Sequence, residues 1–258
     1  LLVSTTDQLY TKASNSGTGL GAYTSRRTFG AGESPAHMLC VYNNRAYWVD
    51  TTSQIFSMNT AYTKAETTNT TYTFKVPEAD DIVWMREHAN GIYIGTLNRD
   101  SGFSYVYNWN GIVADVWANR FKVASKASLA GIVDENGSLF IVSSNAKLLQ
   151  LNGGSFVEVG RFPLKKDLLY KANQLILNER FIHPNGMAII RGNLSILINS
   201  RENNTTEVSY LENIHSGIWE FDGESLYHKH ALSYRTATGA ITDYGQVNLL
   251  AVGALAYT

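Results

Sequence analysis

Short hydrophobic runs recur along the chain, each separated from the next by a few polar or glycine-containing residues. The second run of each group opens at Arg45, Gly91, Gly137 and Gly192, so the steps are 91−45 = 46, 137−91 = 46 and 192−137 = 55 residues. Short runs rich in Val, Ile, Tyr and Phe between turn residues predict strands. A repeat of this length made only of strands must bury its faces against neighbouring copies, so the pattern predicts a β-propeller.

The repeats predict four complete blades, each an antiparallel sheet of four strands. The predicted strands are 36–43, 45–50, 53–58 and 71–76; 81–88, 91–96, 104–109 and 113–117; four strands within 128–160; and 185–192, 192–199, 216–221 and 225–232. Asn90-Gly91 and Asn110-Gly111 favour type I′ hairpin turns, in which both residues have positive φ. The longer last step reflects a polar insertion at 200–213.

Both ends of the chain carry further strand-like runs. Residues 1–5, 8–12 and 23–29 align with second, third and fourth strands, and 247–253 and 254–258 align with first and second strands. These runs predict partial blades at both ends and about five or more blades in the ring. The termini could close a five-bladed ring, or the ring could continue on both sides.

The domain prediction is a single β-propeller over residues 1–258. Because the chain begins at Leu1 without Met and ends within a strand-like run, we expect a segment of a longer polypeptide. One segment, 163–181, has apolar residues at helical spacing and predicts either a short helix or a long strand.

Three predicted third strands end in a hydrophobic residue followed by Asn or Asp and then Gly. These endings are Trp109-Asn110-Gly111, Leu151-Asn152-Gly153 and Phe221-Asp222-Gly223. Asn, Asp and Gly tolerate the backbone angles of tight turns, so we expect the hydrophobic residue to pack on the next blade. The carboxylate of Asp222 is expected to cap its turn.

The composition limits the classes of protein to which this chain can belong. The 258 residues are 44% hydrophobic with a net charge of −1, which predicts a sizeable core and does not favour a nucleic-acid partner. Arg26-Arg27 and Lys165-Lys166 are the only adjacent basic pairs. Cys40 is the sole cysteine, so no intrachain disulfide or cysteine-based zinc cluster can form, and its apolar neighbours predict burial. No apolar stretch approaches the ~20 residues of a membrane span.

Several residues resemble parts of known sites but lack the required context. The glycines of 17–21 would need a following helix to bind a dinucleotide, so a flexible loop is expected. His228 and His230 share one face of a predicted strand, but a metal site needs further ligands, and an exposed outer strand is the preferred interpretation.

A propeller glycosidase would need two acids projecting from inner strands. Asp50, Asp81, Glu87 and Asp134 are the candidates. Asp50 and Asp134 lie at strand ends where Asp commonly caps a turn, and Glu87 lies between Arg86 and His88. We therefore expect no catalytic, cofactor-binding or metal-binding residue.

The phrases VYNWNG, LLQLNGG, IWEFDG and FIHPNGMAIIRGNLSILIN resemble β-propeller domains of large virion proteins of tailed bacteriophages. This resemblance implies a non-catalytic structural module of a tail or capsid assembly. Its partners would be other virion subunits in a homo- or hetero-oligomeric assembly, and its location would be the virion. Loops and outer strands would make the contacts, with the insertion 200–213 as the first candidate.

Two other classes of protein fit the same pattern. One is a glycan-binding or glycan-cleaving propeller that recognises a host surface, with exposed aromatic residues beside carboxylates. The other is an extracellular or periplasmic interaction propeller, whose full gene would encode a signal peptide.

Overall fold

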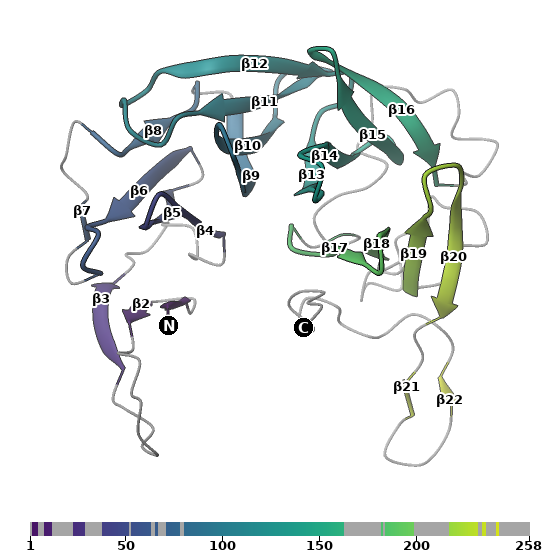
Figure 1. Ribbon diagram of the computed structural model, residues 1–258, viewed down its shortest axis with the longest axis horizontal. Coiled ribbons are helices and arrows are strands. Elements are labelled where there is room, and N and C mark those ends of the chain that lie inside the picture. Colours follow the sequence, from purple (N-terminus) through teal and green to yellow (C-terminus); the bar gives the residue numbers. More distant parts are fainter. Residues whose placement is uncertain are drawn as a thin grey trace. The chain divides into compact units, whose positions relative to one another are not determined.

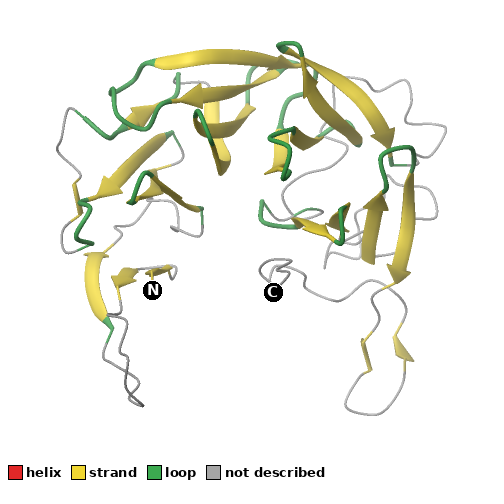
Figure 2. Ribbon diagram, viewed as in Figure 1, coloured by secondary structure: helices red, strands yellow, loops and turns green. Residues whose placement is uncertain are grey.

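The computed structural model describes a β-rich chain. The described residues are 2–4, 8–11, 23–28, 38–51, 53–62, 65–66, 71–77, 80–162, 182, 184–198, 217–231, 234–235 and 241–242. All regular elements among them are strands, drawn in yellow in Figure 2. In this part of the chain no helix has the length and apolarity needed to cross a bilayer. The loop 17–21, segment 163–181, insertion 200–213 and run 247–258 lie outside the described residues.

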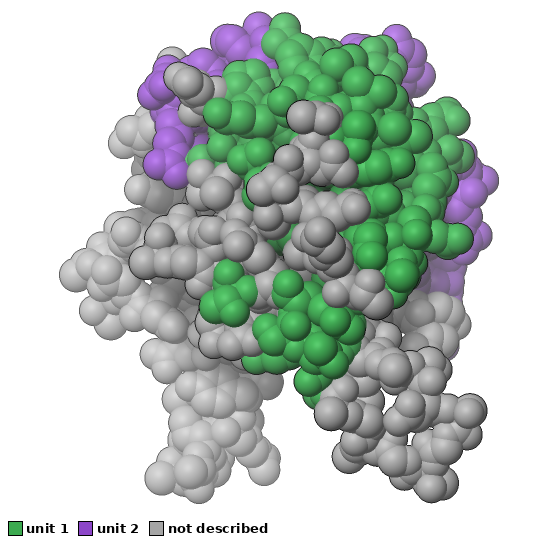
Figure 3. All heavy atoms as spheres, turned by 90° about the vertical axis from the view of Figure 1, so that its left-hand side faces the viewer, with its two compact units in different colours: residues 1–94, 107–120 green, residues 95–106, 121–258 purple. Residues whose placement is uncertain are grey.

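The chain divides into two compact units, coloured separately in Figure 3. Unit 1 contains residues 1–94 and 107–120, and unit 2 contains residues 95–106 and 121–258. The prediction of a single domain over 1–258 stays a prediction.

Unit 1 begins with two sheets that lie in chain order. The first is β1 (Leu2–Ser4), β2 (Gln8–Thr11) and β3 (Thr24–Thr28), paired antiparallel in that order. The second is β4 (Leu39–Tyr42), β5 (Arg45–Thr51) and β6 (Gln54–Met58), with β7 (Ala65–Glu66) and β8 (Phe74–Lys75) both pairing with β6. The three predicted N-terminal strands are thus confirmed.

The predicted strand 71–76 is confirmed only over β8 (Phe74–Lys75), because the outer position of this sheet is shared by the two short strands β7 and β8. Tyr72 has a positive φ of 60°, which interrupts an extended strand. Thr71 instead forms a bridge with Val113 of a later loop.

The next sheet has the order β9 (Asp80–His88), β10 (Gly91–Asn98), β11 (Ser104–Trp109) and β12 (Trp117–Val123). Its first three strands follow the prediction. The fourth was predicted at 113–117 but begins at Trp117. Figure 1 labels this strand β12. Asp115 has a φ of 55°, so residues 113–116 form a loop.

Unit 2 holds two further four-stranded antiparallel sheets. One is β13 (Ser128–Val133), β14 (Leu139–Ser143), β15 (Lys147–Asn152) and β16 (Ser155–Arg161). The other is β17 (Met187–Ile190), β18 (Asn193–Ile198), β19 (Gly217–Phe221) and β20 (Leu226–Ala231). A short pair, β21 (Tyr234–Arg235) and β22 (Ile241–Thr242), follows. These sheets confirm the predicted strands of 128–160 and of the fourth blade.

The first strands of consecutive sheets contact each other within each unit: β4 with β9 in unit 1, and β13 with β17 in unit 2. In a propeller, the first strands of consecutive blades are adjacent, and the other strands of each blade follow outward in chain order. The sheets within each unit have this arrangement. The predicted fold class, all-β with four-stranded antiparallel blades, is confirmed, and the number of blades in the ring stays a prediction.

Aromatic side chains pack consecutive sheets together. In unit 1 the ring of Trp109 lies 5.5 Å from that of Tyr47 and 5.3 Å from that of Phe74. In unit 2 the ring of Phe221 lies 6.2 Å from that of Phe140. Trp109 and Phe221 therefore contact the preceding blade, and the prediction that they pack on the next blade was wrong.

The Asn-Gly turns also differ from the prediction. Positive φ at two successive residues occurs at Asn43-Asn44, Gly153-Gly154 and Arg191-Gly192, whereas Asn90 and Asn110 do not have positive φ. The Asn110 side chain instead accepts main-chain hydrogen bonds from the residues that follow it. This Asx geometry holds Asn110 out of the left-handed region.

Candidate interaction surface

The segment 110–117, here called the apolar loop, links β11 to β12 in unit 1. Ile112 and Val113 are each 47% exposed, Val116 is 56% exposed and Trp117 is 37% exposed. These four make up half of the eight large hydrophobic residues exposed in the described part of the chain. Scattered exposed apolar residues are normal, but a contiguous group indicates a surface for binding.

The first half of the apolar loop is fixed by its own residues. Asn110 Oδ1 accepts hydrogen bonds from the main-chain N–H of Ile112 at 2.9 Å and of Val113 at 3.0 Å. The indole N–H of the buried Trp109 donates to the carbonyl oxygen of Val113 at 2.7 Å. The backbone that presents Ile112 and Val113 is therefore held from both sides.

The preceding sheet supplies further hydrogen bonds to the apolar loop. The Tyr72 N–H donates to Ile112 O at 2.9 Å, and the Lys75 N–H donates to Asp115 Oδ1 at 2.7 Å. The buried Tyr47 hydroxyl donates to Gly111 O at 2.7 Å. Residues 71–76 therefore anchor the loop where a regular outer strand was predicted.

Gly111 is required at its position by backbone angle and by space. Its φ is 75°, and a Cβ there would lie 3.0 Å from Tyr42 Cδ1 and 3.1 Å from the Tyr47 hydroxyl oxygen. A side chain would therefore push against the tyrosine that anchors the loop.

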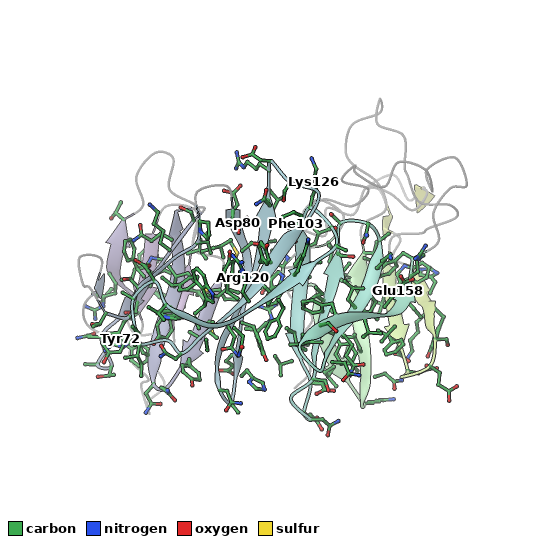
Figure 4. All side chains as sticks on the ribbon, turned by 90° about the horizontal axis from the view of Figure 1, so that it is seen from above. Tyr72, Asp80, Phe103, Arg120, Lys126 and Glu158 are labelled. Atoms are coloured by element: carbon green, nitrogen blue, oxygen red, sulfur yellow. The ribbon has the colours of Figure 1, made fainter. Side chains whose placement is uncertain are left out.

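At the other end of the loop, the Trp117 ring packs against one member of a buried, hydrogen-bonded pair of polar residues. Its ring packs edge-on against Tyr107 at 5.2 Å, and the Tyr107 hydroxyl donates to Asp80 Oδ2 at 3.0 Å. Burial first, and then the Asp80 carboxylate, raise the pKa of Tyr107, while Arg120 opposes them. The Arg120 guanidinium carbon lies 5.8 Å from the centre of the Trp117 ring, and Figure 4 labels Asp80 and Arg120.

Two of the aspartates considered from sequence cap turns. Asp134 Oδ1 accepts from the N–H of Asn136 at 2.9 Å and of Ser138 at 2.7 Å. Asp222 Oδ1 accepts from the N–H of Glu224 at 3.0 Å and of Ser225 at 2.9 Å, and these bonds lower its pKa. The turn-capping prediction for Asp222 is confirmed.

The remaining acids of the glycosidase hypothesis are not brought together as an acid pair by any described contact. Asp81 is half-buried and Glu87 is exposed on β9, and Asp50 lies on β5 with its side chain outside the described part. Cys40 is 7% exposed, which confirms its predicted burial. Burial, more than the nearby Glu87 carboxylate, raises the pKa of Cys40 to about 12, so the thiol stays protonated and unreactive at neutral pH.

His228 lies on β20, but its ring is half-buried and rests 5.3 Å from that of Trp219. The predicted outer strand is confirmed, since β20 is the last strand of its sheet, but the His228 side chain is not fully exposed because its face of the strand covers Trp219. The side chain of His230 lies outside the described residues. Across the described residues no group of three or more His, Cys, Asp and Glu is placed to hold a metal ion.

The opposite face of the same strands carries a second polar cluster. Glu220, 2% exposed, accepts hydrogen bonds from Asn193 Nδ2 and Tyr227 Oη, each at 2.8 Å, and from Lys229 Nζ. Lys229, followed by Tyr227 and Asn193, lowers the pKa of the Glu220 carboxyl. All its contacts lie within one sheet, so the cluster stabilises that sheet.

The sequence analysis missed the apolar loop because VADVW has the composition of a strand. The sequence did contain one signal for this loop. Asn110-Gly111 begins a hairpin loop, and an Asp lies among three β-branched residues there, so turn-forming and apolar residues occur in the same segment. The predicted contact loop 200–213 lies outside the described residues.

No family model matches the sequence, and no curated protein matches it. Similar solved structures include a chain of a mitotic checkpoint complex, with a TM-score of 0.48 and 10% identity over 87% of this chain and 63% of that chain. BamB from Moraxella catarrhalis gives 0.47 and 12% over 91% of this chain and 76% of that chain. YCF48 bound to D1 peptide gives 0.38 and 11% over 80% and 71%. This chain thus spans less than two thirds of the first of them, and these identities and scores support no conclusion about function.

Proposed function

We propose that the chain is a non-catalytic interaction module that binds a partner protein through the apolar loop. The observation that carries this proposal is the exposure of Ile112, Val113, Val116 and Trp117 on a backbone fixed by hydrogen bonds. Removing apolar surface from water favours association, and a loop that is already ordered loses little conformational entropy on binding. Trp is also among the residues that contribute most to protein interfaces.

The carboxylates with described contacts support a structural role for the acids of the chain. Asp134 and Asp222 cap turns, Asp80 accepts a hydrogen bond from a buried tyrosine, and Glu220 accepts three hydrogen bonds within its own sheet. A carboxylate whose lone pairs are used in this way is a poor general base or nucleophile.

We propose further that the partners are other subunits of a phage virion and that the protein is located in the virion. The sequence resemblance to virion propeller domains supports it. Mass spectrometry of purified particles tests it: the chain should be present in fixed stoichiometry, and its absence from particles would refute the virion role while leaving the interaction module in place.

Site-specific photo-crosslinking tests the interaction module itself. A photoreactive amino acid replaces Val116, which is 56% exposed, or Val157, which is 48% exposed on β16 and serves as the matched control. We expect one protein partner to crosslink at position 116 and not at 157, in the cells or particles that contain the chain. Equal labelling at the two positions, or crosslinks at 116 to glycan or lipid only, would overturn the proposal.

A further inference from the structure

Asparagine is followed by glycine at five places in the chain: 90–91, 110–111, 136–137, 152–153 and 185–186. The side-chain amide of an asparagine can be attacked by the main-chain nitrogen of the next residue, and glycine hinders this attack least because it has no side chain. The attack requires the asparagine side chain to turn toward that nitrogen and the backbone between the two residues to rotate. Hydrogen bonds or packing that prevent either movement suppress the reaction.

Packing and hydrogen bonds fix two of these pairs within unit 1. Gly91 is buried, and a Cβ there would lie 2.4 Å from the Trp109 carbonyl oxygen, so its backbone lies against a neighbouring strand and has little room to rotate. Asn110 Oδ1 accepts two main-chain hydrogen bonds, and the carbonyl oxygen of Gly111 accepts the Tyr47 hydroxyl at 2.7 Å. Neither asparagine can readily reach the geometry for attack.

Two pairs of unit 2 are restrained by main-chain hydrogen bonds. At 136–137 the attacking nitrogen is engaged, because the Gly137 N–H donates to the carbonyl oxygen of Asp134 at 3.0 Å. At 185–186, Asn185 is half-buried, and the carbonyl oxygen of the buried Gly186 accepts the Leu197 N–H at 2.7 Å. Rotation of either backbone would break its hydrogen bond.

The pair at 152–153 has none of these restraints from the described part of the chain. Asn152 is exposed at the end of β15, and its one described side-chain contact, the Ser155 hydroxyl at 3.4 Å, is made to its main-chain oxygen and not to its amide. Gly153 and Gly154 are exposed, with φ of 57° and 91°, and a Cβ on either would have nothing within 4 Å. No described residue accepts the Gly153 N–H.

From this contrast we infer that Asn152 is a site of spontaneous deamidation at the tip of the β15–β16 hairpin. Base removes the proton of the Gly153 N–H, the nitrogen attacks Asn152 Cγ, and ammonia leaves, so that a cyclic succinimide forms. Water then opens the ring at either of its two carbonyl groups and yields aspartate or isoaspartate. Overall, water is consumed and ammonia is released, with no change of oxidation state. This inference is independent of the apolar loop and of the proposed function.

The modification changes both the charge and the backbone of the hairpin. Either product adds a carboxylate to a chain whose net charge is −1. Isoaspartate also lengthens the main chain, because the side-chain carbon becomes part of it. Asn152 pairs with Ser155 in the register that closes the hairpin, and an added main-chain atom disturbs this pair.

The test incubates the full folded chain at neutral and at mildly alkaline pH and follows all five asparagines by peptide mapping with mass spectrometry. We expect Asn152 to deamidate at least about tenfold faster than the other four, and faster at the higher pH because base removes the attacking N–H proton. Enzymatic methylation of isoaspartyl carboxylates should label the same peptide. In concentrated urea, where the folded restraints are lost, the five rates should converge.

Two matched variants assign the acidic product that accumulates. Asn152→Gln should remove it, because attack on the longer side chain requires a larger ring. Asn136→Gln alters another exposed asparagine at a hairpin turn and should leave the product unchanged. Both side chains are exposed, so neither substitution disturbs the core.

Three outcomes would overturn the inference. One is a rate at Asn152 that does not exceed the rates at the other pairs in the folded chain. Another is an equal preference for Asn152 in urea, which would assign the rate to local sequence and not to the fold. Aspartate without isoaspartate would exclude the succinimide route. None of these outcomes bears on crosslinking at position 116, so the proposed function is tested separately.

Discussion

The buried carboxylates of Asp80 and Glu220 are held by donors on other strands of their own sheets. Asp80 accepts from the Tyr107 hydroxyl, and Glu220 accepts from Asn193, Tyr227 and Lys229. A buried carboxylate is costly unless hydrogen bonds compensate for lost hydration, so removing one donor costs more than the net value of one hydrogen bond. Individual side chains therefore control the stability of whole sheets.

Tyr107→Phe should lower the free energy of unfolding by about 1–3 kcal/mol, because it leaves the buried Asp80 carboxylate without the hydroxyl donor. Tyr23→Phe is the control, since Tyr23 is 51% exposed and its hydroxyl can be replaced by water. Urea denaturation followed by tryptophan fluorescence measures both. Equal stability of the two variants would contradict a structural role for the Tyr107 hydroxyl.

Acid should weaken the β15–β16 pair through Glu158. Its hydrogen bond to Arg161, followed by contacts with Lys147, lowers the pKa of Glu158 from 4.5 to about 2. A carboxyl with a lowered folded-state pKa contributes its stability above about pH 4.5 and loses it as the pH falls toward about 2. Glu158→Gln should therefore lose less stability than the unsubstituted chain between these pH values, in denaturation curves recorded at several pH values.

The effect of Glu158 should be small, because its side chain is 35% exposed and solvent screens the interaction. A drop in stability on acidification that is identical in Glu158→Gln and in the unsubstituted chain would show that the pair contributes nothing.

At the scale of elements, the hairpin between β9 and β10 depends on close backbone approach. A Cβ on Gly91, whose φ is 143°, would lie 2.4 Å from the carbonyl oxygen of Trp109. Main chain cannot move aside as a flexible side chain can. Gly192 directly precedes the corresponding strand of a later repeat, has a φ of 82° and has nothing within 4 Å of such a Cβ.

Gly91→Ala should therefore destabilise the chain by about 1–3 kcal/mol more than Gly192→Ala, because both pay for a positive φ and only the first also forces two strands apart. Thermal unfolding monitored by circular dichroism compares the two variants. Similar midpoints for both would mean that β10 and β11 can separate at this point without cost.

Sequence predicted the strands well where apolar residues alternate between clear turns. The sheet β13–β16 follows its prediction closely, because 128–160 alternates strands and turns without intervening residues. The prediction failed at 113–116, and within 71–76 it holds only for Phe74–Lys75, although both segments have the β-branched and aromatic residues typical of strands. Positive φ at Asp115 and Tyr72 and hydrogen bonds between distant segments decide the structure there, and neither is visible in local composition.

The same reasoning explains why the candidate surface was missed. In β12, polar and apolar residues alternate only over 120–123, and this run is too short to indicate a strand that begins at Trp117. The sequence predicts a fourth strand at 113–117, and only the structure shows that the side chains of Val113, Val116 and Trp117 face water.

At the scale of the whole molecule, a net charge of −1 at pH 7 gives copies of the chain little mutual repulsion. With four large hydrophobic residues exposed on one loop, apolar contacts between copies are then opposed only weakly. The colloidal behaviour of the protein should depend on this loop more than on the other described surfaces.

Val116→Glu should lower light scattering of concentrated solutions at pH 7 relative to the unsubstituted chain, because it moves the net charge further from zero and removes apolar surface at the most exposed apolar side chain of the loop. Val157→Glu adds the same charge on β16 and should have a smaller effect. Indistinguishable scattering by the two variants would assign the effect to net charge alone.

The anchors of the apolar loop are main-chain groups, the Asn110 and Asp115 side chains, and aromatic residues beneath them. Ile112 and Val113 take part through their backbones, and none of these hydrogen bonds uses the side chain of Ile112, Val113 or Val116. The side chains at these three positions can therefore be exchanged without altering the support that shapes the loop. Substitutions at these three positions could therefore direct the chain to a different target, while the residues that support the loop stay unchanged.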